Sequence, residues 1–416
     1  MTSVDDIRER PAVDPPAGPT PTTGAPGTSR DEGALPSRPR TWLAVLSLAF
    51  GAAVIVMTEF VPVGFLPRAA SDLDISLGLA GTMVLAPGLG AAVSAPVIVV
   101  AAGRLDRRRM IVLLATLVVL SNGLAALAPD FAVVLVARLL LGVAIGGFWA
   151  VVPPLGARLA CPEAGIRATS VILAGLSVGT VIGLPAGQLL GDLIGWRATF
   201  GVVAGAALLA LAAQATLLPR LASSAGMRFA NLAAVLRRPV ARTILIVGGV
   251  ATVGQFSAST FVTPFLLERA QLSSGAATAL FFGYGAAGIG GTLAGAALIA
   301  QPDLDLRRCA VTFGVLLVML PLAAGVPVVV GLLCVGWGLV WGVVPLALQT
   351  LMLTVTPGTQ EASAAVLMSL LQLGIAAGSA MGGLVVDSAG LDALFLVSGG
   401  VAIAAGVLAA AMRRGV

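Results

Sequence analysis

Apolar runs of about 20 residues follow one another along the chain from Thr41 onward, and short polar or turn-forming stretches separate them. A helix of this length rises ~1.5 Å per residue and crosses ~30 Å of bilayer hydrocarbon. The runs are continuous rather than alternating, which argues against a β-barrel. The pattern predicts an all-α membrane protein with twelve transmembrane helices. The expected spans are 41–67, 76–101, 110–128, 131–155, 168–190, 198–218, 242–266, 276–300, 309–325, 327–350, 361–385 and 391–412.

Two longer polar segments divide this pattern. Residues 1–40 are rich in proline and charge and lack an apolar stretch of signal-peptide length, so we expect a disordered tail. Residues 219–241 carry several arginines between the sixth and seventh spans and are expected to be a linker. The predicted domains are therefore the tail, an N-terminal six-helix half at 41–218, the linker, and a C-terminal half with a short tail at 242–416.

The two halves resemble each other in sequence. An offset of 195 residues, without a gap, superimposes the end of the fifth span on the end of the eleventh. Eight positions in a window of 22 residues are then identical, whereas chance would supply mainly glycine matches in such a glycine-rich chain. Parallel repeats of this kind place a substrate site between two pseudo-symmetric halves. The matched pairs are Gly179/Gly374, Gly183/Gly378, Gly187/Gly382, Leu189/Leu384, Asp192/Asp387, Gly195/Gly390, Ala198/Ala393 and Phe200/Phe395.

The distribution of arginine sets the expected orientation, because all 24 basic residues are arginine. With both termini in the cytoplasm, 20 of the 24 lie in the tails, the inner loops and the linker. Arg68, Arg197 and Arg269 lie outside, and Arg138 lies within a span. The positive-inside rule therefore predicts a cytoplasmic tail, a cytoplasmic linker and two cytoplasmic termini. The basic excess then reflects topology rather than nucleic-acid binding.

The composition excludes several classes of function. Hydrophobic residues make up 58% of the chain and charged residues 10%, which no soluble domain of this size carries. Without lysine there is no GxxxxGK[ST] nucleotide-binding loop, and without histidine there is no serine triad and no typical zinc site. Cys161, Cys309 and Cys334 have no spacing typical of a metal site or a disulfide framework. We therefore expect neither an enzyme nor a metal site nor a cofactor, and an energy source outside the chain.

Three stretches are similar to the motifs of one family. "AAGRLDRRRM" (101–110) follows the second span, "ARLLLGVAIGGFWA" (137–150) lies in the fourth, and "GLSVGTVIGLPAGQLLGDLIGWR" (175–197) covers the fifth. With twelve spans in two halves, they resemble the major facilitator superfamily over residues 41–412. "TEFVPVGFLP" (58–67) adds a resemblance to drug:proton antiporter-type bacterial efflux permeases, which include purine ribonucleoside, arabinose and chloramphenicol exporters. The resemblance implies a proton-coupled exporter in a bacterial inner membrane, driven by the proton-motive force.

The loop after the second span matches the part of the family that is assigned to a conformational latch. Asp106 and the basic residues after it match, although Gly103 stands one residue closer to the aspartate than is usual. Asp106 would accept hydrogen bonds from arginines of the next inner loop, or cap the inner start of the eleventh span. A plain positive-inside loop is the alternative. The residues assigned to the latch are Asp106, Arg107, Arg108, Arg109, Arg158 and Arg167, with Asp305 and Arg307 in the matching loop of the second half.

Two charges lie well inside predicted spans, and each must face the bundle interior because a charge in hydrocarbon is costly. At ~1.5 Å per residue, Glu59 lies ~12 Å and Arg138 ~10 Å below the same outer end. We therefore expect a direct or water-bridged pair. Pro62, which has no amide hydrogen, frees the carbonyl of Thr58 beside Glu59. The functional interpretation is proton coupling by Glu59, tuned by Arg138; the alternative is a permanent ion pair that joins the first and fourth spans.

Glycines recur at every fourth residue of the fifth span and form one stripe along the helix. The family resemblance links this stripe and its proline with exporters rather than with uptake symporters. Close packing of helices would explain the glycines equally well. The helix-packing motif comprises Gly175, Gly179, Gly183, Pro185 and Gly187.

In the family's fold, the first, fourth, seventh and tenth spans line the cavity. Trp337 and Trp341 share one helical face, as do Gln255, Ser259 and Thr263. Aromatic faces with amide partners suit a flat neutral heterocycle or an amphipathic drug, and a carboxylate would also suit a cation. Bundle packing or interfacial anchoring is the alternative for each tryptophan. The cavity candidates are Thr58, Phe148, Trp149, Gln255, Phe256, Ser259, Thr263, Trp337, Trp341 and Gln349.

An uptake symporter of the same superfamily is the main alternative function. A passive channel or a membrane receptor fits the twofold repeat and the two intramembrane charges less well. The expected partners are a small-molecule substrate and the lipid bilayer, with no nucleic acid, and we expect a monomer.

Overall fold

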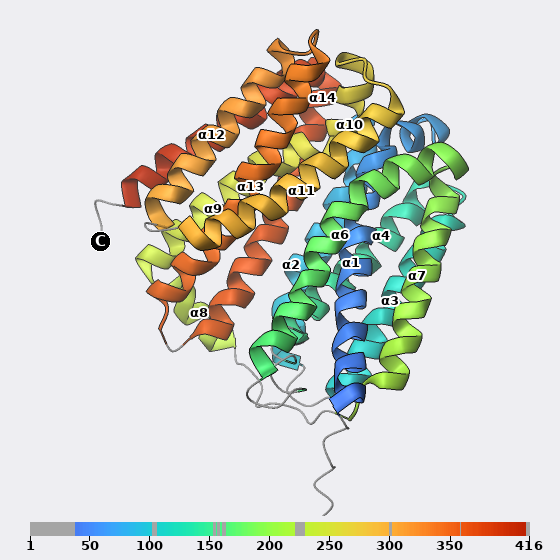
Figure 1. Cartoon of the computed structure of the whole chain (residues 1–416), viewed down its shortest axis with the longest axis vertical. Coiled ribbons are helices and arrows are strands. Elements are labelled where there is room, and N and C mark those ends of the chain that lie inside the picture. The colour runs from blue at the N-terminus through green and yellow to red at the C-terminus, as the bar shows by residue number, and fades with distance from the viewer. Residues whose placement is uncertain are drawn as a thin grey trace, which may run out of the picture. The chain divides into compact units, whose positions relative to one another are not determined.

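The computed structural model describes residues 38–101, 106–152, 155, 159, 164–220, 229–298, 302–357 and 359–412. These residues are almost entirely helical and contain no strand (Figure 1). The predicted tail lies outside them up to residue 37. The helices are α1 (Arg38–Asp72), α2 (Leu77–Ala101), α3 (Arg107–Ala126), α4 (Phe131–Val151), α6 (Gly165–Ile194), α7 (Trp196–Leu217), α8 (Phe229–Leu236), α9 (Pro239–Thr260), α10 (Val262–Pro264), the π-helical turn η3 (Phe265–Arg269), α11 (Ser274–Leu298), α12 (Pro302–Leu322), α13 (Pro327–Val355) and α14 (Gln360–Met412).

The twelve predicted spans are confirmed. Ten of the described helices are long and apolar enough to cross a membrane, and α14 is one of these. Gly390 divides α14 into two spans, because its φ of 79° interrupts the helical backbone. The remaining span, the ninth in chain order, is α12, whose first turns carry charges that set it apart from the ten helices counted above. Gly195, which separates α6 from α7, has a φ of 81°, so the repeat places equivalent glycines at equivalent turns.

The seventh span departs from the prediction of one continuous helix at 242–266. The helix α9 ends at Thr260, and Phe261 has non-helical φ and ψ of −111° and 18°. Pro264 has no amide hydrogen to donate to the carbonyl of Thr260, so the helical hydrogen bonding fails at this point. The chain continues through α10 and the π-helical turn η3.

Glycines allow pairs of helices to approach until their backbones touch. A Cβ atom at Gly175 would lie 2.1 Å from the carbonyl oxygen of Ala49, and one at Gly187 would lie 2.1 Å from that of Val61. The stripe on α6 therefore packs directly on α1. In the second half, a Cβ atom at Gly378 would lie 2.6 Å from the carbonyl oxygen of Val253, so α14 packs on α9 in the same way.

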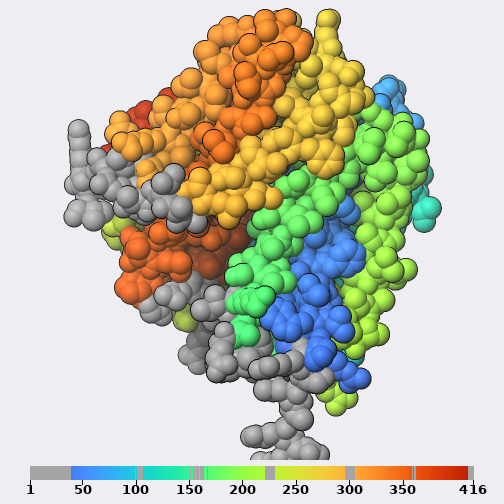
Figure 2. Space-filling model, viewed as in Figure 1, coloured from blue at the N-terminus to red at the C-terminus, as the bar shows by residue number. Residues whose placement is uncertain are grey.

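The two halves meet along two pairs of helices, α2 with α14 and α6 with α11. Figure 2 shows α11, in yellow, against α6, in green. We call the end of the bundle at which α1 ends and α2 begins the distal end, and the opposite end the proximal end. Hydrogen bonds between the halves are found at the distal end and at mid-depth. The mid-depth contact involves Glu59, and it defines the candidate site.

Candidate transport site

Arg138 of α4 is fully buried, and its guanidinium binds backbone rather than a carboxylate. Its Nε donates to the carbonyl oxygen of Met83 at 2.8 Å, Nη1 to that of Thr58 at 2.8 Å, and Nη2 to that of Glu59 at 3.0 Å. These acceptors lie on α2 and α1. One side chain therefore joins three helices, and the planar fork of donors suits this task.

Prolines make two of these carbonyls available. Pro62 lies four residues after Thr58, and Pro87 lies four residues after Met83. In an uninterrupted helix these positions would donate amide hydrogens to Thr58 and Met83, but proline has none. The freed carbonyl of Thr58 was predicted from the sequence. Arg138 supplies the donor that both carbonyls lack, as a buried polar group requires.

Glu59 of α1 is 5% exposed and forms no ion pair with Arg138 within 4.0 Å, although the structure describes both residues. Of the two contacts expected, the direct ion pair does not form between these described residues, because backbone carbonyls occupy the guanidinium, and the water-bridged contact stays a prediction. The carboxylate instead accepts a hydrogen bond of 3.4 Å from Nε2 of Gln372 on α14. This contact crosses between the halves, so Glu59 lies at the surface along which the halves would move.

Thr58 and Asn122 lie on the other side of this site and face the interior of the N-terminal half. The Thr58 hydroxyl donates to the carbonyl of Val54 at 2.7 Å and accepts from Nδ2 of Asn122 at 3.3 Å. Both residues are fully buried. The side chain of Thr58 is therefore part of the helix packing, whereas its backbone carbonyl holds Arg138.

Aromatic side chains cover the contact between the halves beside Glu59. Phe60 of α1 stacks on Phe256 of α9 with ring centroids 6.0 Å apart and an interplanar angle of 16°. Trp341 of α13 meets Phe256 edge to face at 6.4 Å. The structure thus brings the predicted residues Phe256 and Trp341 next to a residue that sequence reasoning missed, Phe60. Ring pairs of this kind present flat apolar surface.

A second polar cluster lies in the C-terminal half. The indole nitrogen of Trp337 donates to Oε1 of Gln255 at 2.7 Å, and Nε2 of Gln255 donates to the hydroxyl of Tyr284 at 2.9 Å. Trp337 and Gln255 were predicted as cavity residues, whereas Tyr284 was missed. Tyr284 is the chain's single tyrosine and lies within the eighth span, so its residue type could have marked it as a site candidate.

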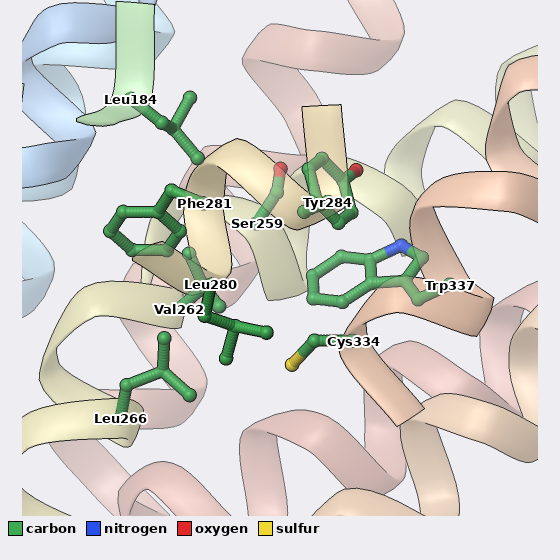
Figure 3. Close-up of a pocket in the computed structure, with 9 residues that line it drawn as sticks. All are labelled: Leu184, Ser259, Val262, Leu266, Leu280, Phe281, Tyr284, Cys334 and Trp337. Carbon is green, nitrogen blue, oxygen red and sulfur yellow. The ribbon is translucent and has the colours of Figure 1, made fainter. Parts of the chain in front are cut away.

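A small pocket opens beside this cluster, between α6 of one half and α9, α11 and α13 of the other (Figure 3). The side chains of Ser259, Tyr284 and Trp337 lie on one side of the view, and Leu184 of α6 approaches from the opposite half. The lining is mainly apolar and aromatic, as in most small-molecule sites. It comprises Leu184, Ser259, Val262, Leu266, Leu280, Phe281, Tyr284, Cys334 and Trp337.

Other predicted cavity residues lie elsewhere. Phe148 is 2% exposed in the core of the N-terminal half, and Trp149 packs edge to face against it. Gln349 is exposed on α13. Thr263 is fully buried, and its hydroxyl has no hydrogen-bond partner among the described residues. In this structure Phe148 packs within the N-terminal half rather than beside Glu59 and Phe256, and its assignment to the cavity stays a prediction.

The latch residues whose contacts are known bind within their own half: Arg108, for example, donates to the carbonyl oxygen of Ala215 on α7 at 2.5 Å. The carboxylate of Asp106 accepts from the backbone amides of Arg108 and Arg109, at 2.8 and 3.2 Å, and so caps its own helix α3. Arg167 lies over the ring of Trp42. Asp305 and Arg308 form an ion pair of 3.8 Å within α12. The expected partner Arg158 lies outside the described residues.

The sequence profile of the Major Facilitator Superfamily matches residues 48–372. The chain belongs to the Major Facilitator Superfamily. It is therefore a multi-pass membrane transporter, and the pseudo-symmetric halves described above are those of this fold.

Relatives and solved structures agree with this assignment. The chain is 32% identical over 359 residues to the purine ribonucleoside efflux pump NepI of Shigella sonnei, covering 86% of this chain and 91% of that protein. It is 31% identical over 379 residues to the transcription regulatory protein OpdE of Pseudomonas aeruginosa, covering 90% and 94%. A bacterial homologue of the human lysosomal transporter Spinster, in an inward-facing and occupied conformation, superimposes with a TM-score of 0.74 at 15% identity, covering 91% and 98%. The human organic anion transporter MFSD10 gives 0.65 at 19% identity, covering 90% and 99%.

Proposed function

We propose that this transporter exports a small organic molecule in exchange for protons, and that Glu59 carries the proton. The observation that carries the proposal is the place of the Glu59 carboxylate. It is buried, has no ion-pair partner within 4.0 Å among the described residues, and accepts a hydrogen bond from the opposite half. An intramembrane carboxylate without a counterion is costly to keep charged, so its retention points to function.

The proposed cycle uses the contact between Glu59 and Gln372. Proton binding removes the charge of the carboxylate and lets Glu59 remain between closed halves. Loss of the proton leaves a charge that favours a wetter, more open arrangement or an incoming cargo group. Gln372 suits this position because its amide group has both a donor and an acceptor and binds either form of the carboxyl group.

Arg138 has a revised role in this proposal. With three backbone carbonyls as partners it holds α1, α2 and α4 together, and it need not move when Glu59 changes its protonation. Its positive charge still acts on Glu59 through space. We therefore assign the proton to Glu59 and the positioning of α1 to Arg138.

The orientation follows from the arginines. From the distribution of the arginines we infer that both termini and the proximal end lie in the cytoplasm of a bacterium, with the protein in the inner membrane. The distal end, at which the halves are joined by hydrogen bonds, then faces outward. In the proposed orientation, the end at which the halves are bonded together is the end from which an exporter releases its cargo.

The cargo that suits the site is flat and partly polar. Phe60, Phe256 and Trp341 offer ring surface beside Glu59, and Gln255 and Tyr284 offer polar groups nearby. A nucleoside or purine fits this chemistry, and the NepI relatives are named as purine ribonucleoside efflux pumps. Sugars and amphipathic drugs are the other cargo classes to test. We propose that the chain works as a monomer without a cofactor, powered by the proton-motive force.

The test is a thermal-stability screen of purified protein against purine nucleosides, pentoses and amphipathic antibiotics at two pH values. A cargo that binds the folded protein raises its melting temperature, since binding to the native state stabilises by mass action. Wild type is compared with Glu59→Gln and with Glu268→Gln, which removes an exposed carboxylate.

We expect a nucleoside to stabilise the wild type and Glu268→Gln in a pH-dependent way, and Glu59→Gln without pH dependence. A pH dependence that survives in Glu59→Gln would contradict the assignment of the proton to Glu59. Stabilisation by pentoses or antibiotics alone would contradict the nucleoside assignment and leave the proton assignment intact.

A further inference from the structure

Two aspartates at equivalent places in the repeat each reach across to the opposite half at the distal end. Asp192 lies near the end of α6, and Asp387 lies at the matching place in α14, 195 residues later. Each aspartate binds a serine at the start of the second membrane span of the opposite half, which is α11 for Asp192 and α2 for Asp387. These contacts are separate from Glu59 and from the pocket of Figure 3.

Asp387 binds the start of α2. Its Oδ2 accepts from the hydroxyl of Ser76 at 2.6 Å, and its Oδ1 accepts from the backbone amide of Gly78 at 2.8 Å. Ser76 also accepts from the amide of Leu79, so it caps α2 while it holds the aspartate. A carboxylate at a helix N-terminus satisfies free amides and interacts favourably with the helix dipole.

Asp192 binds the start of α11 through a serine hydroxyl as well, but its other partners among the described residues are side chains of its own half. Its carboxylate accepts from the hydroxyl of Ser274 and pairs with Arg68 of its own half. Nε2 of Gln188, one turn earlier on α6, donates to Ser274 at 2.7 Å and to Asp192 at 3.2 Å. The carboxylate is therefore held in place by its own half and presented to the other.

The helices that carry these contacts touch through glycine and small side chains. A Cβ atom at Gly78 would lie 2.3 Å from the carbonyl oxygen of Gly383, which leaves no gap between α2 and α14. A Cβ atom at Gly285 of α11 would lie 2.9 Å from the Cα of Val181 of α6. The hydrogen bonds form where the backbones already meet, so separation of the halves would break both.

We propose that Asp192–Ser274 and Asp387–Ser76 are a twofold-related pair of distal latches that hold the distal end closed. They are distinct from the latch residues of the inner loops around Asp106. Each latch joins a carboxylate of one half to a helix start of the other, so neither half can tilt away at this end without losing charge-assisted bonds. Opening of the distal end requires that both latches break together. The proposal depends neither on the identity of the cargo nor on proton coupling by Glu59.

The test measures how often the distal end opens. Cys334 is 2% exposed and lines the pocket that Leu184 of the opposite half helps to close. With Cys161 and Cys309 replaced by serine, the rate at which a water-soluble thiol reagent modifies Cys334 reports the open fraction. The variants are Asp192→Ala, Asp387→Ala and the double variant. The matched control is Asp392→Ala, which removes a distal carboxylate bound to Arg269 of its own half at 2.8 Å.

We expect each latch variant to raise the rate about threefold to tenfold, which is the range for partly exposed charge-assisted hydrogen bonds. The double variant should show about the product of the two effects, and the control should match wild type. Equal rates in the double variant and in Asp392→Ala would overturn the proposal. If an alanine variant does not give monodisperse protein, Ser76→Ala and Ser274→Ala remove the two serine hydroxyl bonds, keep both carboxylates and the bond from the Gly78 amide to Asp387, and should still raise the rate above that of Asp392→Ala.

Spin labels give an independent readout at Leu127 and Val328, which are 83% and 73% exposed at distal turns of the two halves. In a cysteine-free background, double electron–electron resonance measures the distance between them. The double latch variant should shift the distribution to longer distances. A distribution identical to that of Asp392→Ala would also overturn the proposal.

Discussion

Removal of the Arg138 side chain gives the most specific prediction, because its three hydrogen bonds each have a known acceptor. The Arg138→Met substitution keeps a long apolar side chain and removes the donors to Met83, Thr58 and Glu59. The carbonyl of Glu59 can still bond within its helix. The carbonyls of Thr58 and Met83 are left without a donor, since Pro62 and Pro87 stand where their helix partners would be.

Each buried carbonyl without a partner costs about 1–3 kcal/mol, so two cost about 2–6 kcal/mol. The loss of a buried charge offsets part of this cost, because the guanidinium no longer has to be kept out of water. We therefore expect Arg138→Met to lower the free energy of unfolding by about 2–4 kcal/mol. Arg138→Lys should be nearly as destabilising, because one ammonium group does not span acceptors on two helices.

Substitution of a proline tests directly whether the unpaired carbonyls cause this loss of stability. Pro62→Ala restores an amide hydrogen for the carbonyl of Thr58, so Arg138→Met should cost about 1–3 kcal/mol less in that background. Unfolding by SDS in mixed micelles, followed by tryptophan fluorescence, measures all four proteins of this double-mutant cycle. Pro345→Ala, which alters a proline inside α13, is the matched control and should show no coupling. Coupling energies of Pro62→Ala and Pro345→Ala that agree within about 0.5 kcal/mol would refute the reasoning.

Two further predictions concern packing and the second polar cluster. Gly187→Ala should lower the melting temperature, because its Cβ atom would lie 2.1 Å from the carbonyl oxygen of Val61. The control Gly201→Ala should leave the melting temperature unchanged, because nothing lies within 4 Å of its Cβ position. Equal melting temperatures of the two variants would contradict the packing of α6 on α1. Trp337→Phe should destabilise the protein by about 1–3 kcal/mol in the same SDS assay, because Oε1 of Gln255 loses its donor, and an unchanged stability would show that this hydrogen bond is not needed.

The sequence predicted the spans well because their length and hydropathy are properties of the chain itself. It also predicted the freed carbonyl of Thr58, which depends only on the position of Pro62 in a helix. The partner of that carbonyl was not predicted. Which acceptors a guanidinium binds depends on how α4 is rotated against α1 and α2, and side-chain spacing along one helix does not contain that information.

The site residues also divide into those that the sequence predicts and those that depend on how the helices pack. Gln372 was not predicted because the cavity was assigned to the first, fourth, seventh and tenth spans, whereas Gln372 is the single amide side chain of the eleventh. Phe148 was placed in the cavity because it is aromatic, but the structure buries it within the N-terminal half. Pairings between distant helices, such as Glu59 with Gln372, come from tertiary packing alone.

The most direct test of the central claim is the proton balance when cargo binds. Purified protein in weakly buffered detergent solution is mixed with a nucleoside that stabilises it, and a pH-sensitive dye records protons released or taken up. Wild type and Glu268→Gln should release protons on binding, and Glu59→Gln should release none. Release by Glu59→Gln equal to that of wild type would contradict the assignment of the proton to Glu59, and proton uptake by the wild type would contradict exchange and indicate a symporter.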